Sequence, residues 1–187
     1  MPNKVSIDSG TDILIALLYA PGLTSKVGEP IKGYTRLEKL LFLLDRESGL
    51  HRIIEKDYAF EPFDYGPCAQ EIYDDVEMLK DASMVHTGRV ATETALDNVD
   101  DIEQAVVDEE ATTRNQEKTD VFELTERGAK IGKMIFESLP AEDRQRMTQI
   151  KAVFNSQPTS TVLRYVYTKY PEMTTRSKVK DKILSAG

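Results

Sequence analysis

The chain has 187 residues, of which 40% are hydrophobic and 30% charged, and its formal net charge at neutral pH is −8. This length and apolar content suffice for one ordinary domain with a real core, so we expect the chain to fold by itself. Its single cysteine excludes an internal disulfide, and with only two histidines it excludes a four-ligand zinc site built from Cys and His alone.

The sequence also indicates a compartment. The first ten residues lack the basic and then apolar layout of a signal peptide, and the longest apolar run, 13–20, is far shorter than the roughly 20 residues of a membrane span. The scarcity of thiols is typical of a reducing cytoplasm. We therefore expect a soluble, cytoplasmic protein without membrane contact.

The negative charge is concentrated in one segment. Residues 91–120 contain ten acidic side chains against only Arg114 and Lys118, so the rest of the chain is neutral overall. Such a distribution lacks the basic excess of a strong nonspecific nucleic-acid binder. The middle of the segment has apolar residues at helical spacing, so it is either a short amphipathic helix or disordered.

Two helices are predicted in the first quarter of the chain. Ser9 and Asp12 form a capping-box pattern that starts a helix over 10–20. After a loop, Thr35 and Glu38 repeat this pattern at the start of a leucine-rich helix. Because that helix is apolar on more than half of its circumference, we expect it in the middle of the domain.

A short extended segment and an acidic helix follow. Pro62 in the run FEPFDYGP excludes a central strand and favours an edge strand or an extended loop. Gly66 and Pro67 are expected to open the third helix, which runs to about Asp81. Its buried face is apolar, and its outer face carries acids.

The rest of the chain predicts a β-hairpin and further helices. Residues 84–90 and 121–124 read as two strands, and Thr125 is expected to cap the helix after them. Three more helices are predicted: one opening at Pro140, one after the break at 155–158, and a last one from Thr174.

The order of these elements is that of a winged-helix domain, in which three helices precede a two-stranded wing. The predicted fold is mostly α, with a winged-helix-like core, a small β-hairpin wing and a C-terminal helical extension. The core spans 9–137 with the acidic insert, 91–119, at the wing tip, where added length is tolerated. The extension spans 138–187.

The chain also resembles a known family. The run LEKLLFLLDRE, the segment FEPFDYGP and the helix near CAQEIYDDV are similar to the Panacea-type domains of phage-associated antitoxin proteins and their winged-helix relatives. The resemblance covers roughly 10–85, and its matching positions are Leu37, Lys39, Leu40, Phe63, Tyr65, Gly66, Pro67 and Tyr73. It implies a cytoplasmic module that neutralises a toxin, the product of a neighbouring gene, or adapts it to another machine. In some relatives it also implies autoregulation by DNA binding.

One candidate binding surface is the YGP turn with the acidic third helix. Its residues are Tyr65, Gly66, Pro67, Glu71, Asp74 and Asp75. A DNA-reading helix needs donors and positive charge, and phosphates would repel this acidic face. Insertion of this helix into a DNA groove is therefore the least favoured of three alternatives, and the other two are a solvated face and a face that docks a basic protein partner. The turn either lines a ligand site or places an aromatic side chain in the core.

The C-terminal extension holds the basic candidates. Arg164, Arg176, Lys178, Lys180 and Lys182 lie among tyrosines and suggest a nucleic-acid patch. At about 100° per residue, however, Arg176 and Lys180 fall on a different side of a helix from Lys178 and Lys182, so no single basic stripe results. The alternative is a packed helix pair with snorkelling cations, which could also hold the acidic insert.

Nothing in the sequence specifies a reaction. His51 and His86 are not accompanied by a nucleophile motif, and Cys68 is more typical of a small packing residue than of a catalytic thiol. Acidic runs lack the spacing of a cation-binding loop, and no cofactor or metal is implied. We expect no enzyme but a regulatory module, antitoxin-like, that binds a protein partner. The alternative is a winged-helix transcriptional regulator that binds DNA as a homodimer.

Overall fold

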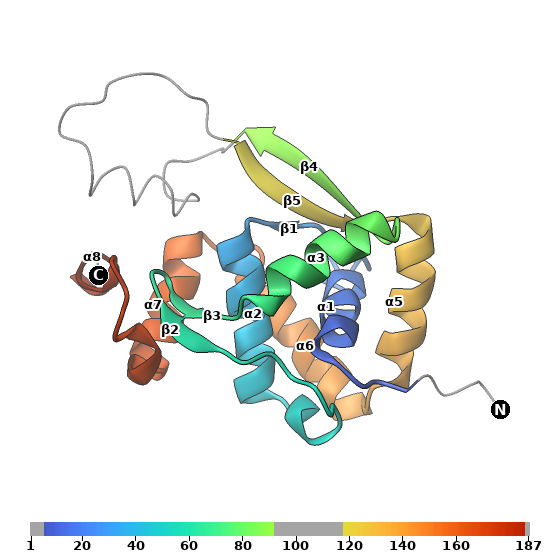
Figure 1. Ribbon diagram of the computed structural model, residues 1–187, viewed down its shortest axis with the longest axis horizontal. Helices are drawn as coiled ribbons and strands as arrows, with labels where there is room; N and C mark the ends of the chain where they lie inside the picture. The colour runs from blue at the N-terminus through green and yellow to red at the C-terminus, as the bar shows by residue number, and fades with distance from the viewer. Residues whose placement is uncertain (1–5, 92–117, 186–187) are drawn as a thin grey trace.

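The computed structural model describes residues 6–91 and 118–185. Within them the chain is mostly helical with a small antiparallel sheet, which confirms the predicted fold class at that level (Figure 1). The acidic insert, including its expected helix, lies almost wholly outside the described residues. No helix in the described part is both long and apolar enough to cross a membrane.

The first two helices form the centre of the fold. Helix α1 (Gly10–Tyr19) starts with the predicted capping box, in which the Asp12 carboxylate accepts the backbone N–H of Ser9 at 3.1 Å. Helix α2 (Tyr34–Glu47) is buried along most of its length, as its leucines predict. Its predicted capping box is wrong, because Gly33 precedes the helix and Glu38 turns inward, where it is only 3% exposed.

The three-stranded sheet joins distant parts of the chain. The predicted hairpin is confirmed as β4 (Val85–Ala91) and β5 (Lys118–Leu124), in which Val85 pairs with Leu124. A strand that the sequence did not reveal, β1 (Ile31–Lys32), pairs with β5 on the other side and gives the order β1-β5-β4. The strands β4 and β5 extend along the upper edge of the molecule in Figure 1.

The FEPFDYGP run forms a second, two-stranded sheet. Strands β2 (Glu61–Phe63) and β3 (Gly66–Cys68) pair with Phe63 opposite Gly66, so Pro62 lies in a short strand of a hairpin and not in a central strand. The prediction that Gly66 and Pro67 open a helix is therefore wrong. Helix α3 (Glu71–Asp81) begins after them, because the positive φ of Gly66, 84°, belongs to the hairpin turn.

The remaining helices cover the other faces of α1 and α2. They are α5 (Glu126–Ser138), α6 (Ala141–Phe154) and α7 (Thr159–Lys169), with the short turns η1 (Leu50–Arg52) and η2 (Pro171–Thr174) and the terminal α8 (Lys180–Ser185). Thr125 caps α5 as predicted, since its hydroxyl accepts the N–H of Gly128 at 3.1 Å. The last helix begins later than Thr174, which belongs to η2.

One buried cluster runs through the expected core and the expected extension. It includes Leu40 of α2 and Ile72 of α3 together with Ile150 of α6 and Val166 of α7. Polar contacts join the same parts, because the buried ammonium of Lys151 in α6 donates to the carbonyl oxygens of α1 residues Leu17 and Leu18 and of Ala20 at 2.8–2.9 Å. The extension therefore supplies part of the core.

Candidate docking surface

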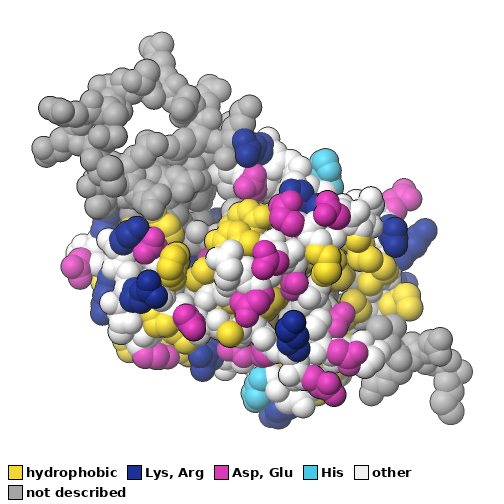
Figure 2. All heavy atoms as spheres, in the orientation of Figure 1, with side chains coloured by type: hydrophobic (Ala, Val, Ile, Leu, Met, Phe, Trp, Pro, Cys, Tyr) yellow, Lys and Arg dark blue, Asp and Glu magenta, His cyan; other side chains and the backbone are white. Residues whose placement is uncertain are grey.

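Helix α3 presents an acidic face to solvent. Because helical residues repeat every 3.6 positions, five exposed side chains fall within about 120° of arc. They are Glu71, Asp74, Glu77, Met78 and Asp81, which we call the acidic α3 face. Figure 2 shows acidic side chains gathered over α3 with hydrophobic side chains exposed among them. The face thus combines four carboxylates with one apolar side chain, Met78, which is 52% exposed.

One cation lies beside this face. Lys80 bridges Glu77 at 2.7 Å, and the Glu77 side chain is exposed while that of Lys80 is half-buried. Exposed pairs of this kind contribute little free energy, so the bridge gives way readily to another cation. The other three acids have no ion pair among the described salt bridges. The face therefore offers uncompensated negative charge.

Asp75 has a different position from the other predicted acids. It is half-buried, and its carboxylate accepts hydrogen bonds from the hydroxyls of Thr11, at 2.6 Å, and Tyr58, at 2.7 Å. Burial raises the pKa of the Tyr58 hydroxyl, and the hydrogen bond to Asp75 and the charge of that carboxylate raise it further. The phenol therefore stays protonated. Asp75 thus fixes α3 to α1 and to the segment before β2.

The YGP turn lies inside the molecule. Gly66 and Pro67 are buried and Tyr65 is half-buried. A Cβ at Gly66 would come within 2.7 Å of the Tyr167 ring of α7, which covers the turn. The backbone oxygen of Pro67 accepts a hydrogen bond from the Lys39 ammonium at 3.0 Å. The turn is therefore a joint between α2 and α7, and it sets the position of α3.

A buried polar cluster lies under this joint. Glu38 is only 3% exposed. Its carboxylate accepts hydrogen bonds from the Lys39 ammonium at 2.9 Å and from the Cys68 thiol at 3.2 Å. The Tyr73 hydroxyl is also hydrogen-bonded to it. Burial and the nearby Glu38 charge raise the pKa of the Cys68 thiol to about 12. The thiol stays protonated and is a poor nucleophile. Sequence reasoning missed this cluster, although two charged residues inside a leucine stripe were a signal.

The basic C-terminal candidates are dispersed over several contacts. Arg164 donates to the backbone oxygen of Ile183 at 3.1 Å, Lys178 bridges Asp64 at 2.7 Å, and the Arg176 guanidinium lies 5.3 Å from the Phe63 ring centroid. Lys180 is half-buried and Lys182 exposed on the short α8. The structure thus places three of the five in contacts that hold the C-terminal segment, and no helix aligns them in one stripe.

A pocket of 320 Å³ lies where β2, β3 and the start of α3 meet. It is lined by Ala59, Glu61, Phe63, Cys68, Gln70, Glu71 and Arg176. Through Gln70 and Glu71 it is continuous with α3, and Glu71 belongs to the acidic α3 face. Cys68 is the only cysteine of the chain.

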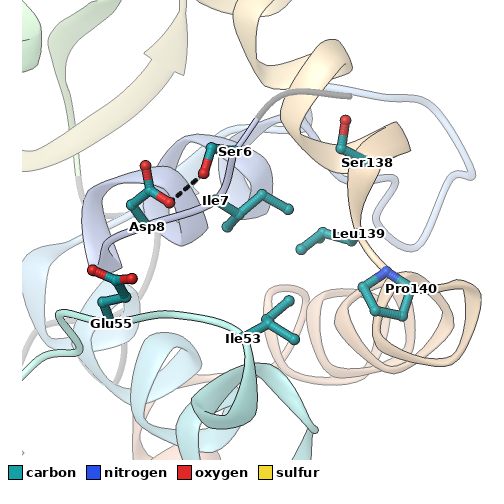
Figure 3. Close-up of a pocket in the computed structure, with 8 residues that line it drawn as sticks. All are labelled: Ser6, Ile7, Asp8, Ile53, Glu55, Ser138, Leu139 and Pro140. Atoms are coloured by element: carbon teal, nitrogen blue, oxygen red, sulfur yellow. Dashed lines mark hydrogen bonds between the residues drawn. The ribbon is translucent and has the colours of Figure 1, made fainter. Parts of the chain in front are cut away.

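A second pocket, of 880 Å³, lies on the side of the N-terminal segment. Ile7, Ile53 and Leu139 point into it, and its titratable lining side chains are Asp8 and Glu55 (Figure 3). The Ser6 hydroxyl donates to Asp8 at its edge. Among the described residues of this lining, no base, nucleophile and acid lie in a catalytic arrangement. Among the described residues, no group of three or more His, Cys, Asp or Glu side chains is placed to hold a metal ion.

Comparison of the chain with models of protein families, with curated proteins and with solved structures finds no match.

Proposed function

We propose that the protein is a non-enzymatic regulatory binding module, antitoxin-like, that acts by docking a basic protein partner on the acidic α3 face. The observation that carries this proposal is the set of four exposed carboxylates around the half-exposed Met78. Complementary charge speeds encounter and excludes wrong partners, and an adaptable methionine adds apolar contact. Binding would neutralise the partner or adapt it to another machine.

The way in which α3 is held supports this role. Asp75 fastens the middle of the helix, and the joint of Lys39, Gly66 and Pro67 fixes the chain just before it. These joint residues are among those that resemble Panacea-type antitoxin domains. A rigid helix loses little conformational entropy on binding, so its acids and Met78 form a preorganised surface.

Charge reversal on α3 tests the proposal. The double variant Asp74→Lys, Asp81→Lys leaves the Asp75 contacts intact, and we expect it to weaken binding of the neighbouring gene product about tenfold or more. The matched control is the reversal Glu137→Lys on α5, an exposed acid whose partner is Lys133. Isothermal titration calorimetry at low and moderate salt measures both. Equal affinity of wild type and the α3 double variant would remove this face from the interface.

A second candidate function is that of a winged-helix DNA-binding regulator, acting as a homodimer. The favouring observation is the order α1, β1, α2, α3, β4, β5, with the β2–β3 hairpin inserted between α2 and α3, together with the sheet order β1-β5-β4. The acidic α3 would be repelled by phosphates, so contact would come from the β4–β5 hairpin or the C-terminal helices.

A gel shift on the protein's own promoter tests this alternative. If DNA binds through α8, the double variant Lys180→Glu, Lys182→Glu should weaken binding. The slope of log affinity against log salt concentration should also fall by about one for each lost phosphate contact. Lys178 is left unchanged because it bridges Asp64. The absence of a shift at low salt would end the alternative.

A further inference from the structure

The pocket between the β2–β3 hairpin and α3 has an aromatic wall that already carries a cation. The Phe63 side chain is 45% exposed, and the Arg176 guanidinium lies over its ring at 5.3 Å from the centroid. Arg176 is itself exposed and comes from the C-terminal segment. The ring thus binds a guanidinium within the chain, as the face of an aromatic ring does through its quadrupole.

The rim of the same pocket carries two carboxylates. Glu61 on β2 and Glu71 on α3 both line it and are exposed, against Arg176 as the one cation of the lining. Ala59 and the protonated Cys68 supply the small, uncharged part of the wall. A side chain that suits this lining has an apolar stem, a planar cationic end for the ring and donors for the carboxylates. Arginine has all three, whereas the lysine ammonium lacks the planar fork.

The size and position of the pocket agree with a single anchoring side chain. Its 320 Å³ lies at the lower end of the roughly 300–1,000 Å³ found for small-molecule sites. It adjoins the acidic α3 face through Glu71. Interfaces concentrate their binding energy in a few pockets that receive Arg or aromatic anchors, surrounded by weaker contacts.

We propose that this pocket, between Phe63, Glu61 and Glu71, is the anchor site of the docking surface and receives an arginine side chain of the basic partner. This inference rests on the proposed function, since it names the residue by which the partner is held. The incoming guanidinium takes the place of Arg176 on the Phe63 ring, so the chain's own C-terminal segment competes with the partner for the anchor.

Titration of the full ¹⁵N-labelled chain with penta-arginine at low salt tests the inference by NMR. The backbone amides of Ala59, Phe63 and Gln70 report on the pocket, and those of Asp74 and Asp81 report on the rest of the face. We expect penta-arginine to shift both sets of amides and the uncharged isostere penta-citrulline to shift neither.

Variants of Phe63 and of Arg176 should change the Kd for penta-arginine in opposite directions. Phe63→Leu keeps an apolar side chain at an exposed position and should raise the Kd for penta-arginine about two- to fivefold, while the shifts at Ala59 and Gln70 shrink. Arg176→Gln removes the competitor and should lower the Kd by a similar factor.

The outcomes separate this inference from the function on which it rests. Shifts confined to Asp74 and Asp81, or a Phe63→Leu variant that binds as wild type does, would overturn the anchor site and leave the acidic α3 face as a docking surface. Shifts at neither set of amides would overturn both proposals.

Discussion

At the end of α1, the ammonium group of Lys151 replaces the water that would otherwise solvate the last carbonyl oxygens. The side chain is fully buried and donates to Leu17, Leu18 and Ala20. The helix dipole favours a cation at a helix C-terminus, whereas burial opposes the charge, and the three carbonyl oxygens are acceptors for the N–H groups of the side chain. One residue of α6 thereby fixes the end of α1.

Replacing this lysine should destabilise the fold strongly. Lys151→Met keeps much of the apolar stem but leaves three buried carbonyl oxygens without their donor, so we expect the free energy of unfolding to fall by about 2–4 kcal/mol. Urea denaturation followed by circular dichroism measures the change. Lys130→Met, at an exposed position of α5, is the control and should stay within about 0.5 kcal/mol of wild type. Similar midpoints for the two variants would contradict the role of Lys151.

The same residue makes stability depend on pH. Burial lowers the pKa of Lys151 to about 7, although the nearby Glu29 carboxylate raises it. The unfolded lysine keeps its ordinary, higher pKa, so the unfolded chain binds more protons at pH values above about 7. Wild type should therefore gain stability relative to Lys151→Met as the pH rises from 7 to 9. Urea titrations of both proteins at three pH values measure this gain. A difference in the free energy of unfolding that stays constant with pH would contradict the prediction.

Gly66 is a second residue whose replacement tests the geometry. An Ala there would hold a φ of 84° and place its Cβ 2.7 Å from the Tyr167 ring. We expect Gly66→Ala to lose about 1–3 kcal/mol of stability from this strain and overlap. Gly88→Ala is the control, because no described atom beyond the two chain neighbours lies within 4 Å of the added carbon. Thermal unfolding compares the two, and an unchanged midpoint for Gly66→Ala would show that α7 does not pack tightly on the turn.

At the scale of elements, local patterns predicted most helices but not the pieces made by distant contacts. The stripes of α2, α3 and α7 and the Thr125 cap are visible in a few neighbouring residues. Strand β1 is only two residues long and exists through its pairing with β5, some ninety residues later. The late start of α3 likewise follows from the pairing of Phe63 with Gly66, which competes with the helix-opening tendency of Pro67.

The joint between α2 and the C-terminal helices depends on Glu47. Its side chain is only 6% exposed. The carboxylate accepts hydrogen bonds from the Lys169 ammonium at 2.8 Å and, at 3.0 Å each, from the Tyr165 hydroxyl, the Tyr170 hydroxyl and the Arg146 guanidinium. Burial raises the pKa of the Glu47 carboxyl, but hydrogen bonds from Lys169 and the two tyrosines outweigh it and leave the pKa lowered. The ionised form is thus the one that holds the helices together.

Neutralising this carboxylate should loosen α6 and α7. We expect Glu47→Gln to lower the free energy of unfolding by about 1–3 kcal/mol, because the amide cannot accept from all four donors and loses the charge. The wild-type contribution is present above the ordinary Glu pKa and is lost as the pH falls through the lowered one. Hydrogen exchange of α7 amides measures the effect, with Glu137→Gln as the exposed control. Unchanged exchange in α7 would show that apolar packing alone holds the helix.

At the scale of the whole molecule, the acidic face of α3 was predictable from the sequence, whereas the contacts of Asp75 and the pocket beside the face were not. Helical spacing alone places Asp74 and Glu71 outward, but it places Asp75 there as well, and only the Thr11 and Tyr58 contacts reveal its internal role. The anchor pocket needs Phe63 and Arg176 together, which lie more than a hundred residues apart in the chain. Arg176 lines that pocket together with Glu71 of the acidic α3 face, so the fold brings a cation of the C-terminal segment to the edge of this face.

The continuity of the core makes a prediction about the whole chain. A chain that ends at residue 137 keeps α1, α2, α3 and all but the last residue of α5, but loses Met147, Ile150 and Val166 from the buried cluster and the Lys151 contacts to α1. The apolar surface of α2 that these residues cover would then face water, which costs about 25 cal/mol per Å², whereas domains are stable by only about 5–15 kcal/mol. We expect this chain to lack a cooperative thermal transition and to be degraded by a protease under conditions in which the full chain survives. A cooperative transition and a dispersed NMR spectrum for 1–137 would instead show that the C-terminal helices form a separate extension on a core that folds alone.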